Sequence, residues 1–261
     1  MAQWRTERGG GRAETEGIAP PRPPLAATRA ASRRDRVGAS PAEVEAIRHG
    51  QTDANAAGII QGSLIDLPLN ARGRAEAAAL ARAFPRGSLD LILTSTLKRA
   101  RETAEAIAVS TGAPVSVHPE LVEYDWGDYL GKPNEGAIHA SMVGFVDRWK
   151  KGEIDVGPPG GETPRQVAGR VRRVLGPALE AFAARRPDGR VAVVAHGRLN
   201  KILLADLVHG DLARQEDFGQ GNTSVTVLEG HPAPARGSWK LVASNGLAHL
   251  DGIKGDSVES E

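Results

Sequence analysis

Two of the seven histidines in this chain have the same local setting: each follows a short apolar run and precedes a glycine. His49 follows residues 44–47 and comes before Gly50, and His196 follows residues 191–195. In open sheets of mainly parallel strands, ligands bind outside the carboxyl ends of the strands, so we expect both imidazoles at one edge of the sheet. An imidazole in such a place can act as a nucleophile, a proton acceptor or a metal ligand.

Two arginines are predicted to lie beside these histidines. Arg48 directly precedes His49, and Arg99 follows a third apolar run, residues 89–93, at the predicted start of a helix. A guanidinium offers a planar fork of donors that matches phosphate oxygens, and a helix start has a favourable dipole for an anion. Buried cations are costly unless they are paired. Two arginines and two histidines at one site therefore predict a multiply charged anionic ligand, of which phosphate is the simplest.

Each of these signals also has an ordinary structural explanation. A lone Arg-His-Gly tripeptide is weak, a strand-ending histidine is often a hydrogen-bonded structural residue, and an arginine at a helix start often lies in solvent. Their common position at strand ends favours a shared site. Metal binding is the competing functional hypothesis, and it is weaker because no HxH, HExxH or carboxylate cluster accompanies either histidine. We therefore expect neither a metal nor a cofactor.

The elements that must position these residues alternate between short apolar strands and amphipathic helices from residue 43 onward. Strands are predicted at residues 44–47, 89–93, 115–117, 191–195 and 225–228, with a weaker one at 240–243. Helices are predicted at residues 71–84, 97–109, 136–151, 164–185 and 199–209, the fourth with Thr163 as its cap and Pro164 at its first position. Glu45 is unusual within the first strand, because central parallel strands are normally apolar on both faces. Strands separated by helices predict an α/β fold, a three-layer αβα sandwich around a mainly parallel central sheet.

The charge of the chain is unevenly distributed. The total is +1, but residues 1–42 carry eight arginines and four acidic residues, a net +4, whereas residues 43–261 carry a net −3. Ten of the first 42 residues are Gly or Pro and few are large and apolar, so we predict a disordered basic tail at 1–42, with an organellar transit peptide as the alternative. The folded domain is predicted at 43–250, and a disordered C-terminal end at 251–261.

Composition excludes several classes of protein. The chain has no cysteine, which rules out a disulfide framework, a thiol nucleophile, a thiolate zinc site and an iron–sulfur cluster. No apolar run approaches the ~20 residues of a transmembrane helix, and no apolar segment of a secretory signal follows the charged start. The tail lacks interleaved aromatic residues, so no nucleic-acid partner is expected. We expect a cytoplasmic monomer or homodimer without a membrane partner, or a plastid or mitochondrial chain if the tail is a transit peptide.

Several separated motifs, spread over about residues 43–228, resemble the histidine phosphatase superfamily, the phosphoglycerate-mutase-like family. In chain order they are Arg48-His49-Gly50-Gln51-Thr52, Asn55, Gln61-Gly62, Asp66, Pro68-Leu69, Gly73, Thr94-Ser95, Arg99-Ala100, Thr103-Ala104, residues 121–127, Gly160-Gly161-Glu162-Thr163 and Ala195-His196-Gly197. The resemblance implies a phosphoglycerate mutase-like fold. It also implies that the bound anion is a phosphoryl group.

The resemblance further implies a role for each site residue. His49 resembles the nucleophile that takes the phosphoryl group and becomes a phosphohistidine. Glu123 stands where the family has its proton donor to the leaving oxygen, and the same carboxylate would then take a proton from the attacking water. The residues implied to hold the phosphoryl group are Arg48, Asn55, Gly62, Arg99 and His196, of which Arg48 and His196 are also expected to be catalytic.

The first functional hypothesis is a metal-independent phosphomonoester hydrolase that acts through phosphohistidine on a small phosphorylated metabolite. The alternative is phosphoryl transfer of the phosphoglycerate mutase type. Glu123 and His196 are only 73 residues apart, and no tight Arg-Arg pair follows Glu123, which favours a phosphatase. Arg198 and Lys201 are as consistent with contact to a second anionic group on the substrate as with solvated positions on a helix. The basic tail and the unusual run 197–201 keep open a non-catalytic binding module on the same fold.

Overall fold

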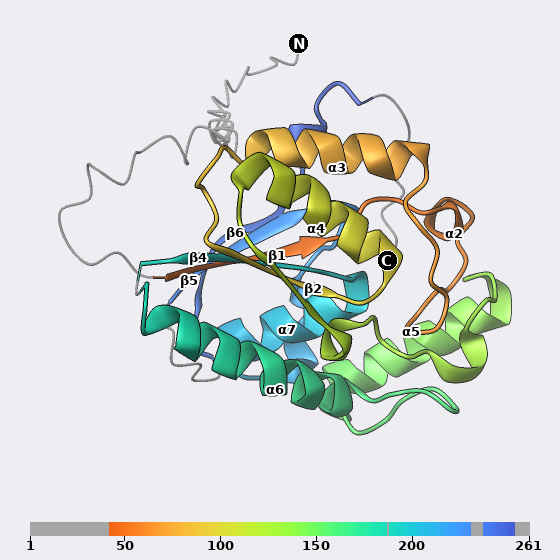
Figure 1. Ribbon diagram of the computed structural model, residues 1–261. Coiled ribbons are helices and arrows are strands. Elements are labelled where there is room, and N and C mark those ends of the chain that lie inside the picture. The colour runs from red at the N-terminus through yellow and green to blue at the C-terminus, as the bar shows by residue number, and fades with distance from the viewer. Residues whose placement is uncertain (1–41, 187, 231–236, 254–261) are drawn as a thin grey trace, which may run out of the picture.

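The computed structural model describes residues 42–186, 188–230 and 237–253. Residues 1–41 of the tail predicted at 1–42, and residues 254–261 of the end predicted at 251–261, lie outside this range. Its middle layer is a six-stranded sheet with the strand order β3-β2-β4-β1-β5-β6 (Figure 1). The strands are β1 (Ala42–Arg48), β2 (Leu91–Ser95), β3 (Val115–His118), β4 (Arg190–Ala195), β5 (Val225–Gly230) and β6 (Lys240–Gly246). A sheet of this kind agrees with the α/β expectation.

The sheet is mainly parallel, as predicted. Strand β4 pairs in parallel with β1 and β2, and β2 pairs in parallel with β3. Strand β5 pairs antiparallel with β1, and β6 antiparallel with β5, so β6 runs in the direction of β1. The carboxyl ends of β1, β2 and β4 consequently lie at one edge of the sheet, where the strands end with Arg48, Ser95 and Ala195.

Helices cover both faces of the sheet, which confirms the three-layer αβα sandwich. In Figure 1, α3 and α4 lie over one face, and α6 and α7 lie over the other, with α5 beside them. The helices are α2 (Asp53–Ala56), α3 (Ala71–Ala83), α4 (Lys98–Thr111), α5 (Gly136–Lys150), α6 (Pro164–Ala183) and α7 (Gly197–His209), and the 3₁₀ segments are η2 (Pro119–Leu121), η3 (Gly127–Tyr129), η4 (Leu212–Asp217) and η5 (Ala248–Leu250). None of the helices that the structure describes combines the length and the hydropathy needed to cross a membrane.

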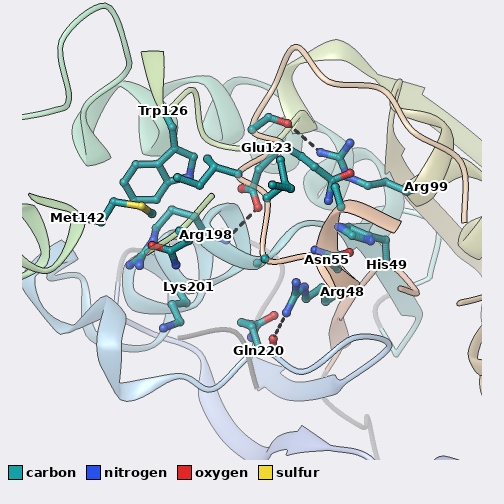
Figure 2. A pocket seen from close by; sticks show the side chains of 18 residues that line it. Arg48, His49, Asn55, Arg99, Glu123, Trp126, Met142, Arg198, Lys201 and Gln220 are labelled. Carbon is teal, nitrogen blue, oxygen red and sulfur yellow. Dashed lines mark hydrogen bonds between the residues drawn. The ribbon is translucent and has the colours of Figure 1, made fainter. Parts of the chain in front are cut away.

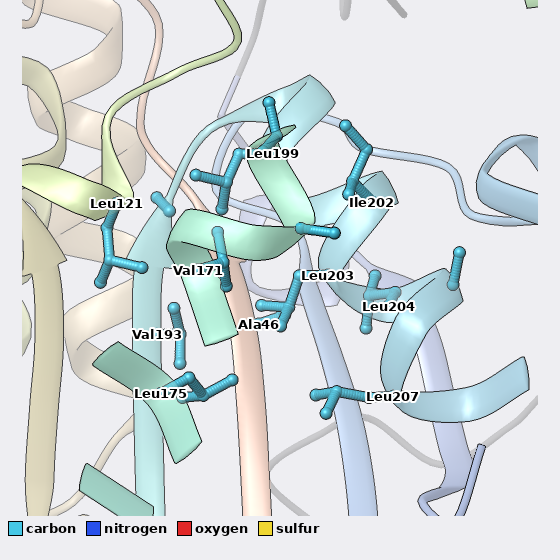
Figure 3. Packing of buried hydrophobic residues seen from close by; sticks show 14 of the residues in the cluster. Ala46, Leu121, Val171, Leu175, Val193, Leu199, Ile202, Leu203, Leu204 and Leu207 are labelled. Atoms are coloured by element: carbon cyan, nitrogen blue, oxygen red, sulfur yellow. The ribbon is translucent and has the colours of Figure 1, made fainter. Parts of the chain in front are cut away.

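Alternating side chains of the buried strands build two apolar cores. Ala46 and Val193 belong to the core under α6 and α7, where residues such as Leu203 pack on the sheet (Figure 3). The next residues along the same strands, Ile47 and Val194, belong to the core under α3 and α4. Strands covered on both faces need apolar residues at successive positions, which explains the unbroken apolar runs in the sequence.

The first strand starts earlier than predicted and accommodates a buried charge. It begins at Ala42, inside the segment assigned to the tail, because Ala42 pairs with Gly230 and Glu43 pairs with Arg190. Glu45 is fully buried, with Oε1 3.1 Å from Nη2 of Arg190, while Nε of the same arginine lies 2.8 Å from Glu43 Oε2. A buried carboxylate is tolerated when a cation compensates for its lost hydration. Arg190 on the neighbouring strand therefore explains the unusual Glu45.

Two other boundaries differ from the prediction where they affect the edge of the sheet. Strand β2 is displaced to Leu91–Ser95 because Ser95 still pairs with β3, and α7 begins at Gly197 directly after its N-cap His196. The predicted start of α6 is confirmed: Thr163 accepts from the backbone of Gln166, whose side chain accepts in turn from the backbone N–H of Thr163. Because β2 extends to Ser95 and His196 directly follows β4, these two residues lie at the ends of adjacent strands.

Candidate active site

The residues that the sequence singled out meet at the carboxyl edge of the sheet, around a cavity of about 150 Å³ (Figure 2). Those that line it are Arg48, His49, Asn55, Gly62, Arg99 and Glu123. His196 is fully buried, and its ring centroid lies 5.2 Å from that of His49 with the rings edge to face. Segments far apart in sequence thus contribute to a single site.

His49 is held as a neutral imidazole with one nitrogen available. Its Nδ1 lies 2.7 Å from the carbonyl oxygen of Gly50, and because a carbonyl only accepts, Nδ1 carries the proton and Nε2 keeps its lone pair. Burial, and then the charges of Arg99 and Arg48, hold the pKa of His49 well below its usual value. An unprotonated Nε2 is what a nucleophilic imidazole requires.

The glycine after His49 is required by a close crossing of two backbones. A Cβ on Gly50 would lie 2.6 Å from the carbonyl oxygen of Gly73, and a Cβ on Gly73 would lie 2.0 Å from that of Gln51. The two segments can approach so closely only without side chains. The crossing fixes the loop that carries His49.

Arg99 is fixed by two carbonyl groups of the opposite loop. Nη1 donates to Ile65 O over 2.7 Å and Nη2 to Gly62 O over 2.8 Å. Gly62 has φ +53°, and a Cβ there would lie 2.2 Å from Leu130 Cδ2, so glycine is needed to turn this carbonyl toward the guanidinium. Burial lowers the pKa of Arg99 to about 10, against the charges of Glu123 and Asp66, so the side chain is cationic at neutral pH.

Arg48 enters the cavity from the end of β1. Its Nη1 donates to the carbonyl oxygen of Gln220, and the side chain is 5% exposed. Burial lowers the pKa of Arg48, and the carboxylates of Glu123 and Glu76 oppose this shift. The guanidinium stays charged and lies beside His49 (Figure 2).

His196 presents a buried donor. Ser95 Oγ accepts from the backbone N–H of Leu97 over 3.2 Å and lies 2.8 Å from His196 Nε2, so this nitrogen is within reach of the hydroxyl proton. Burial, and then the charge of Arg99, lower the pKa of His196 well below its usual value, so the ring is neutral and carries one proton. When the Ser95 hydroxyl donates to Nε2, that proton is on Nδ1. Nδ1 is buried and has no hydrogen-bond partner in the part of the chain that the structure describes. A buried donor without a partner is costly, and an anion in the site would satisfy it.

Glu123 is anchored by the start of α7. Oε1 accepts from the backbone N–H groups of Tyr124 over 2.7 Å and Leu199 over 2.9 Å, and Oε2 accepts from that of Arg198 over 3.2 Å. The first N–H groups of a helix have no partner within the helix, so a carboxylate is well accommodated there. This contact brings Glu123 next to the turn that carries His196.

Asn55 lies on the short helix α2 with its side chain oriented by the cap of that helix. Its Oδ1 accepts from the N–H of Thr52 over 3.1 Å and from the Thr52 hydroxyl over 3.0 Å. With the oxygen occupied, the Nδ2 amino group is the donor that Asn55 can offer to an anion in the cavity.

Arg170 is a positioning residue that our interpretation of the sequence missed. It lies on α6, and its Nε and Nη2 donate to the two carboxylate oxygens of Glu162 over 2.8 and 2.9 Å. Its Nη groups also donate to the carbonyls of Val122 over 2.7 Å and Glu123 over 3.1 Å. The sequence did contain a signal for Arg170, because this charged residue lies between Val167 and Val171, at a position of α6 where the helical period predicts an apolar side chain.

Arg198 and Lys201 line the same cavity, so the hypothesis of solvated positions is wrong. Their side chains are only 9% and 12% exposed. Both pair with Glu216 of η4, Arg198 through Nη1 and Lys201 through Nζ at 2.7 Å. Burial opposes ionisation of Glu216, but the two cations together lower the pKa of its carboxyl to about 2.

The cavity is strongly electropositive. Of the described residues that line it, Arg48, Arg99, Arg198 and Lys201 are cationic and Glu123 is the one carboxylate. Among the described residues, no group of three or more His, Cys, Asp or Glu side chains is arranged to hold a metal ion. The arrangement can bind a multiply charged anion next to a neutral imidazole and a carboxyl group.

Comparisons with known proteins agree with this geometry. The family model described as histidine phosphatase superfamily (branch 1) matches residues 45–245. Glucosyl-3-phosphoglycerate phosphatase of Mycobacterium tuberculosis is 35% identical over 213 residues, which cover 78% of this chain and 94% of the relative. The uncharacterized phosphatase PhoE of Bacillus subtilis is 30% identical, covering 79% of this chain and 96% of the relative. The probable phosphoglycerate mutase GpmB of Yersinia enterocolitica is also 30% identical, covering 80% and 95%.

A solved structure has the same fold. The mycobacterial glucosyl-3-phosphoglycerate phosphatase complexed with VO3 matches with a TM-score of 0.69 and 33% identity, covering 78% of this chain and 99% of that one.

Proposed function

The chain belongs to the histidine phosphatase superfamily, and from this membership we propose that it is a metal-independent phosphomonoesterase that forms a phosphohistidine on His49. The observation that carries the proposal is the hydrogen bond from His49 Nδ1 to the carbonyl of Gly50, which leaves Nε2 unprotonated. This nucleophile faces a cavity whose arginines, Arg48 and Arg99, can bind a phosphoryl group.

In the first step, Nε2 of His49 forms a bond to phosphorus as the bond to the ester oxygen breaks. The carboxyl proton of Glu123 passes to the departing oxygen, so that a neutral alcohol leaves. Arg48, Arg99 and the Nδ1–H of His196 donate to the non-bridging oxygens, where the charge of the transition state spreads. The positive charges supply the electrostatic stabilisation that a metal provides in other phosphoryl-transfer enzymes.

In the second step, water attacks the phosphorus of the phosphohistidine. Glu123, now a carboxylate, accepts the proton of that water as the N–P bond breaks, and His49 returns to its neutral form. The products are inorganic phosphate and the enzyme in its starting protonation state. The backbone N–H groups at the start of α7 stabilise the carboxylate of Glu123, which supports its role as the proton acceptor in this step.

The substrate belongs to the small phosphorylated metabolites. Because relatives at 35% identity are named glucosyl-3-phosphoglycerate phosphatase, glucosyl-3-phosphoglycerate is the first compound to test. Relatives named probable phosphoglycerate mutase make phosphoryl transfer between phosphoglycerates the competing activity.

Hydrolysis of p-nitrophenyl phosphate and of a panel of sugar and glycerate phosphates, with and without EDTA, tests the proposal. We expect turnover that EDTA does not reduce, an acid-labile phosphoenzyme after rapid quenching, and no turnover by His49→Ala. Turnover that requires an added divalent metal would contradict the mechanism. Interconversion of 3-phosphoglycerate and 2-phosphoglycerate in the presence of a bisphosphate primer would favour the mutase.

The cytoplasmic location and the monomeric or homodimeric state stay predictions. Cell fractionation tests the location, and light scattering of the purified chain measures the oligomeric state.

A further inference from the structure

A second group of cations lies in the cavity besides the pair predicted to bind phosphate. Arg198 and Lys201, which we call the second cationic cluster, are at the opposite side of the cavity from His49 and Arg99 in the view of Figure 2. They are three positions apart along α7, which places both side chains on one face of the helix. The mechanism proposed above uses neither side chain.

The second cationic cluster carries more positive charge than its surroundings neutralise. Within the described part of the chain, its one ion-pair partner is the carboxylate of Glu216, shared between Arg198 and Lys201. Two largely buried cations against one carboxylate leave a surplus charge of +1. Such a surplus is costly in a poorly hydrated place, and an anion bound in the cavity would remove the cost.

The second cationic cluster is also held in position before any ligand binds. The guanidinium carbon of Arg198 lies 5.8 Å from the ring centre of Trp126 and 5.3 Å from that of Trp149, within the range of cation–π contact. Its Nη1 donates to Gln215 Oε1 over 3.2 Å as well as to Glu216. A cation that is already fixed loses little conformational entropy when it binds an anion.

The cluster adjoins the side of the site from which the alcohol would leave. The backbone N–H of Arg198 donates to Oε2 of Glu123, the proposed proton donor to the leaving oxygen. A group bound by Arg198 and Lys201 therefore belongs to the alcohol part of the substrate and not to the transferred phosphoryl group.

We propose that Arg198 and Lys201 form a subsite for a second anionic group, a carboxylate or a second phosphate, carried by the alcohol part of the substrate. This inference rests on the proposed phosphatase function and adds a substrate class to it. The second anionic group competes with Glu216 for the two cations, so Glu216 sets how strongly the subsite prefers a charged substrate.

Matched substrate pairs test the subsite. 3-Phosphoglycerate and glycerol 3-phosphate differ only by a carboxylate in place of a hydroxymethyl group, and fructose 1,6-bisphosphate and fructose 6-phosphate differ by one phosphate. The readout is the ratio of kcat/KM for the charged member of each pair to that for the other member. The variants are Lys201→Met, which keeps the apolar stem, Lys201→Arg, which keeps the charge, and Glu216→Gln, which removes the competing carboxylate.

We expect Lys201→Met to lower the ratio about 10- to 100-fold in at least one pair, the effect of losing one charge-assisted hydrogen bond. Lys201→Arg should restore most of the ratio, and Glu216→Gln should raise it. Lys240→Met is the control, because Lys240 is exposed and starts β6 opposite Glu229, at the end of the sheet remote from His49. Its ratio should equal that of the unsubstituted chain.

The two substrate pairs distinguish a carboxylate from a second phosphate as the group that binds to the subsite. A change confined to the glycerate pair assigns the subsite to a carboxylate, and a change confined to the fructose pair assigns it to a phosphate. Ratios unaltered by both Lys201→Met and Glu216→Gln, in a chain that hydrolyses p-nitrophenyl phosphate, would overturn the subsite and leave the phosphatase intact. Failure of the unsubstituted chain to hydrolyse any ester would instead overturn the proposed function.

Discussion

The hydroxyl of Ser95, at the end of β2, lies 2.8 Å from Nε2 of His196, which follows β4. When the hydroxyl donates its proton to Nε2, the imidazole carries its own proton on Nδ1. In this arrangement, a serine that takes no part in bond making directs the Nδ1–H of His196 to the phosphoryl group.

Ser95→Ala should therefore lower kcat/KM for p-nitrophenyl phosphate about 10-fold, as expected for the loss of one orienting hydrogen bond. The ¹⁵N shifts of His196 should report a mixture of the two neutral tautomers in this variant. Ser116→Ala is the matched control, because Ser116 Oγ lies at the same distance, 2.8 Å, from Nε2 of His118 outside the cavity. Equal activity of the two variants would contradict the orienting role.

Glu123→Gln should slow the hydrolysis of alkyl phosphates far more than that of p-nitrophenyl phosphate. An alkoxide needs a proton in order to leave, and p-nitrophenolate does not, so the loss should be about 100-fold for the former, within the range of general acid catalysis. The measurement is kcat/KM over a series of esters with leaving groups of increasing basicity. A loss of the same size across the series would exclude Glu123 as the proton donor.

The stability of the fold should fall as the pH is lowered below about 6.5. Burial, reinforced by the arginine charges, lowers the folded-state pKa of His49 and His196, whereas in the unfolded chain both titrate near 6.5. At pH values between the folded-state pKa and the unfolded-state pKa, the unfolded chain binds protons that the folded chain does not bind. Each histidine then removes up to about 1.4 kcal/mol of unfolding free energy per pH unit.

Urea unfolding at pH 7.5 and 5.5 measures this effect. His196→Asn should lose less stability between the two pH values than the unsubstituted chain. The control is His139→Asn, on the partly exposed helix α5, which should lose as much stability as the unsubstituted chain. An unchanged pH dependence in His196→Asn would show that this imidazole is not the source.

Arg170→Met should destabilise the fold by about 3 kcal/mol, because it leaves Glu162 and several carbonyls without their donor in a largely buried place. It should also reduce turnover, since Glu123 loses the support of its backbone carbonyl. Arg165→Met, on the same helix, removes a similar pair with Asp155 that is exposed to water, and its unfolding temperature should not change measurably. Similar unfolding temperatures for the two variants would contradict the positioning role of Arg170.

A chain that lacks residues 1–37 should unfold at the same temperature as the full chain. The described ladders of β1 begin at Ala42, and they involve β4 and β5. Thermal unfolding followed by circular dichroism compares the two chains, and a large loss of stability after truncation would show that the segment contributes to the fold.

The positions of His49 and His196 were accessible from the sequence, because apolar strands and the glycines after them are local signals. The strand boundaries near the site were not. Ser95 extends β2 because β3 pairs with it, and Glu45 is acceptable in β1 because Arg190 lies on the adjacent strand. Pairing between strands is a property of neighbours in space, which local patterns do not contain.

The sequence by itself determined the three-layer αβα architecture, the edge at which the site forms and the types of group that meet there. Only the tertiary structure decided how those groups are tuned: the tautomer of His49 set by Gly50, the hydrogen bond between Ser95 and His196, and the anchoring of Glu123 on the backbone of α7. It also decided that Arg198 and Lys201 face the cavity and share one carboxylate. The physical reason is that residue type and period follow from local chain geometry, whereas protonation and charge balance depend on burial and on partners distant in sequence.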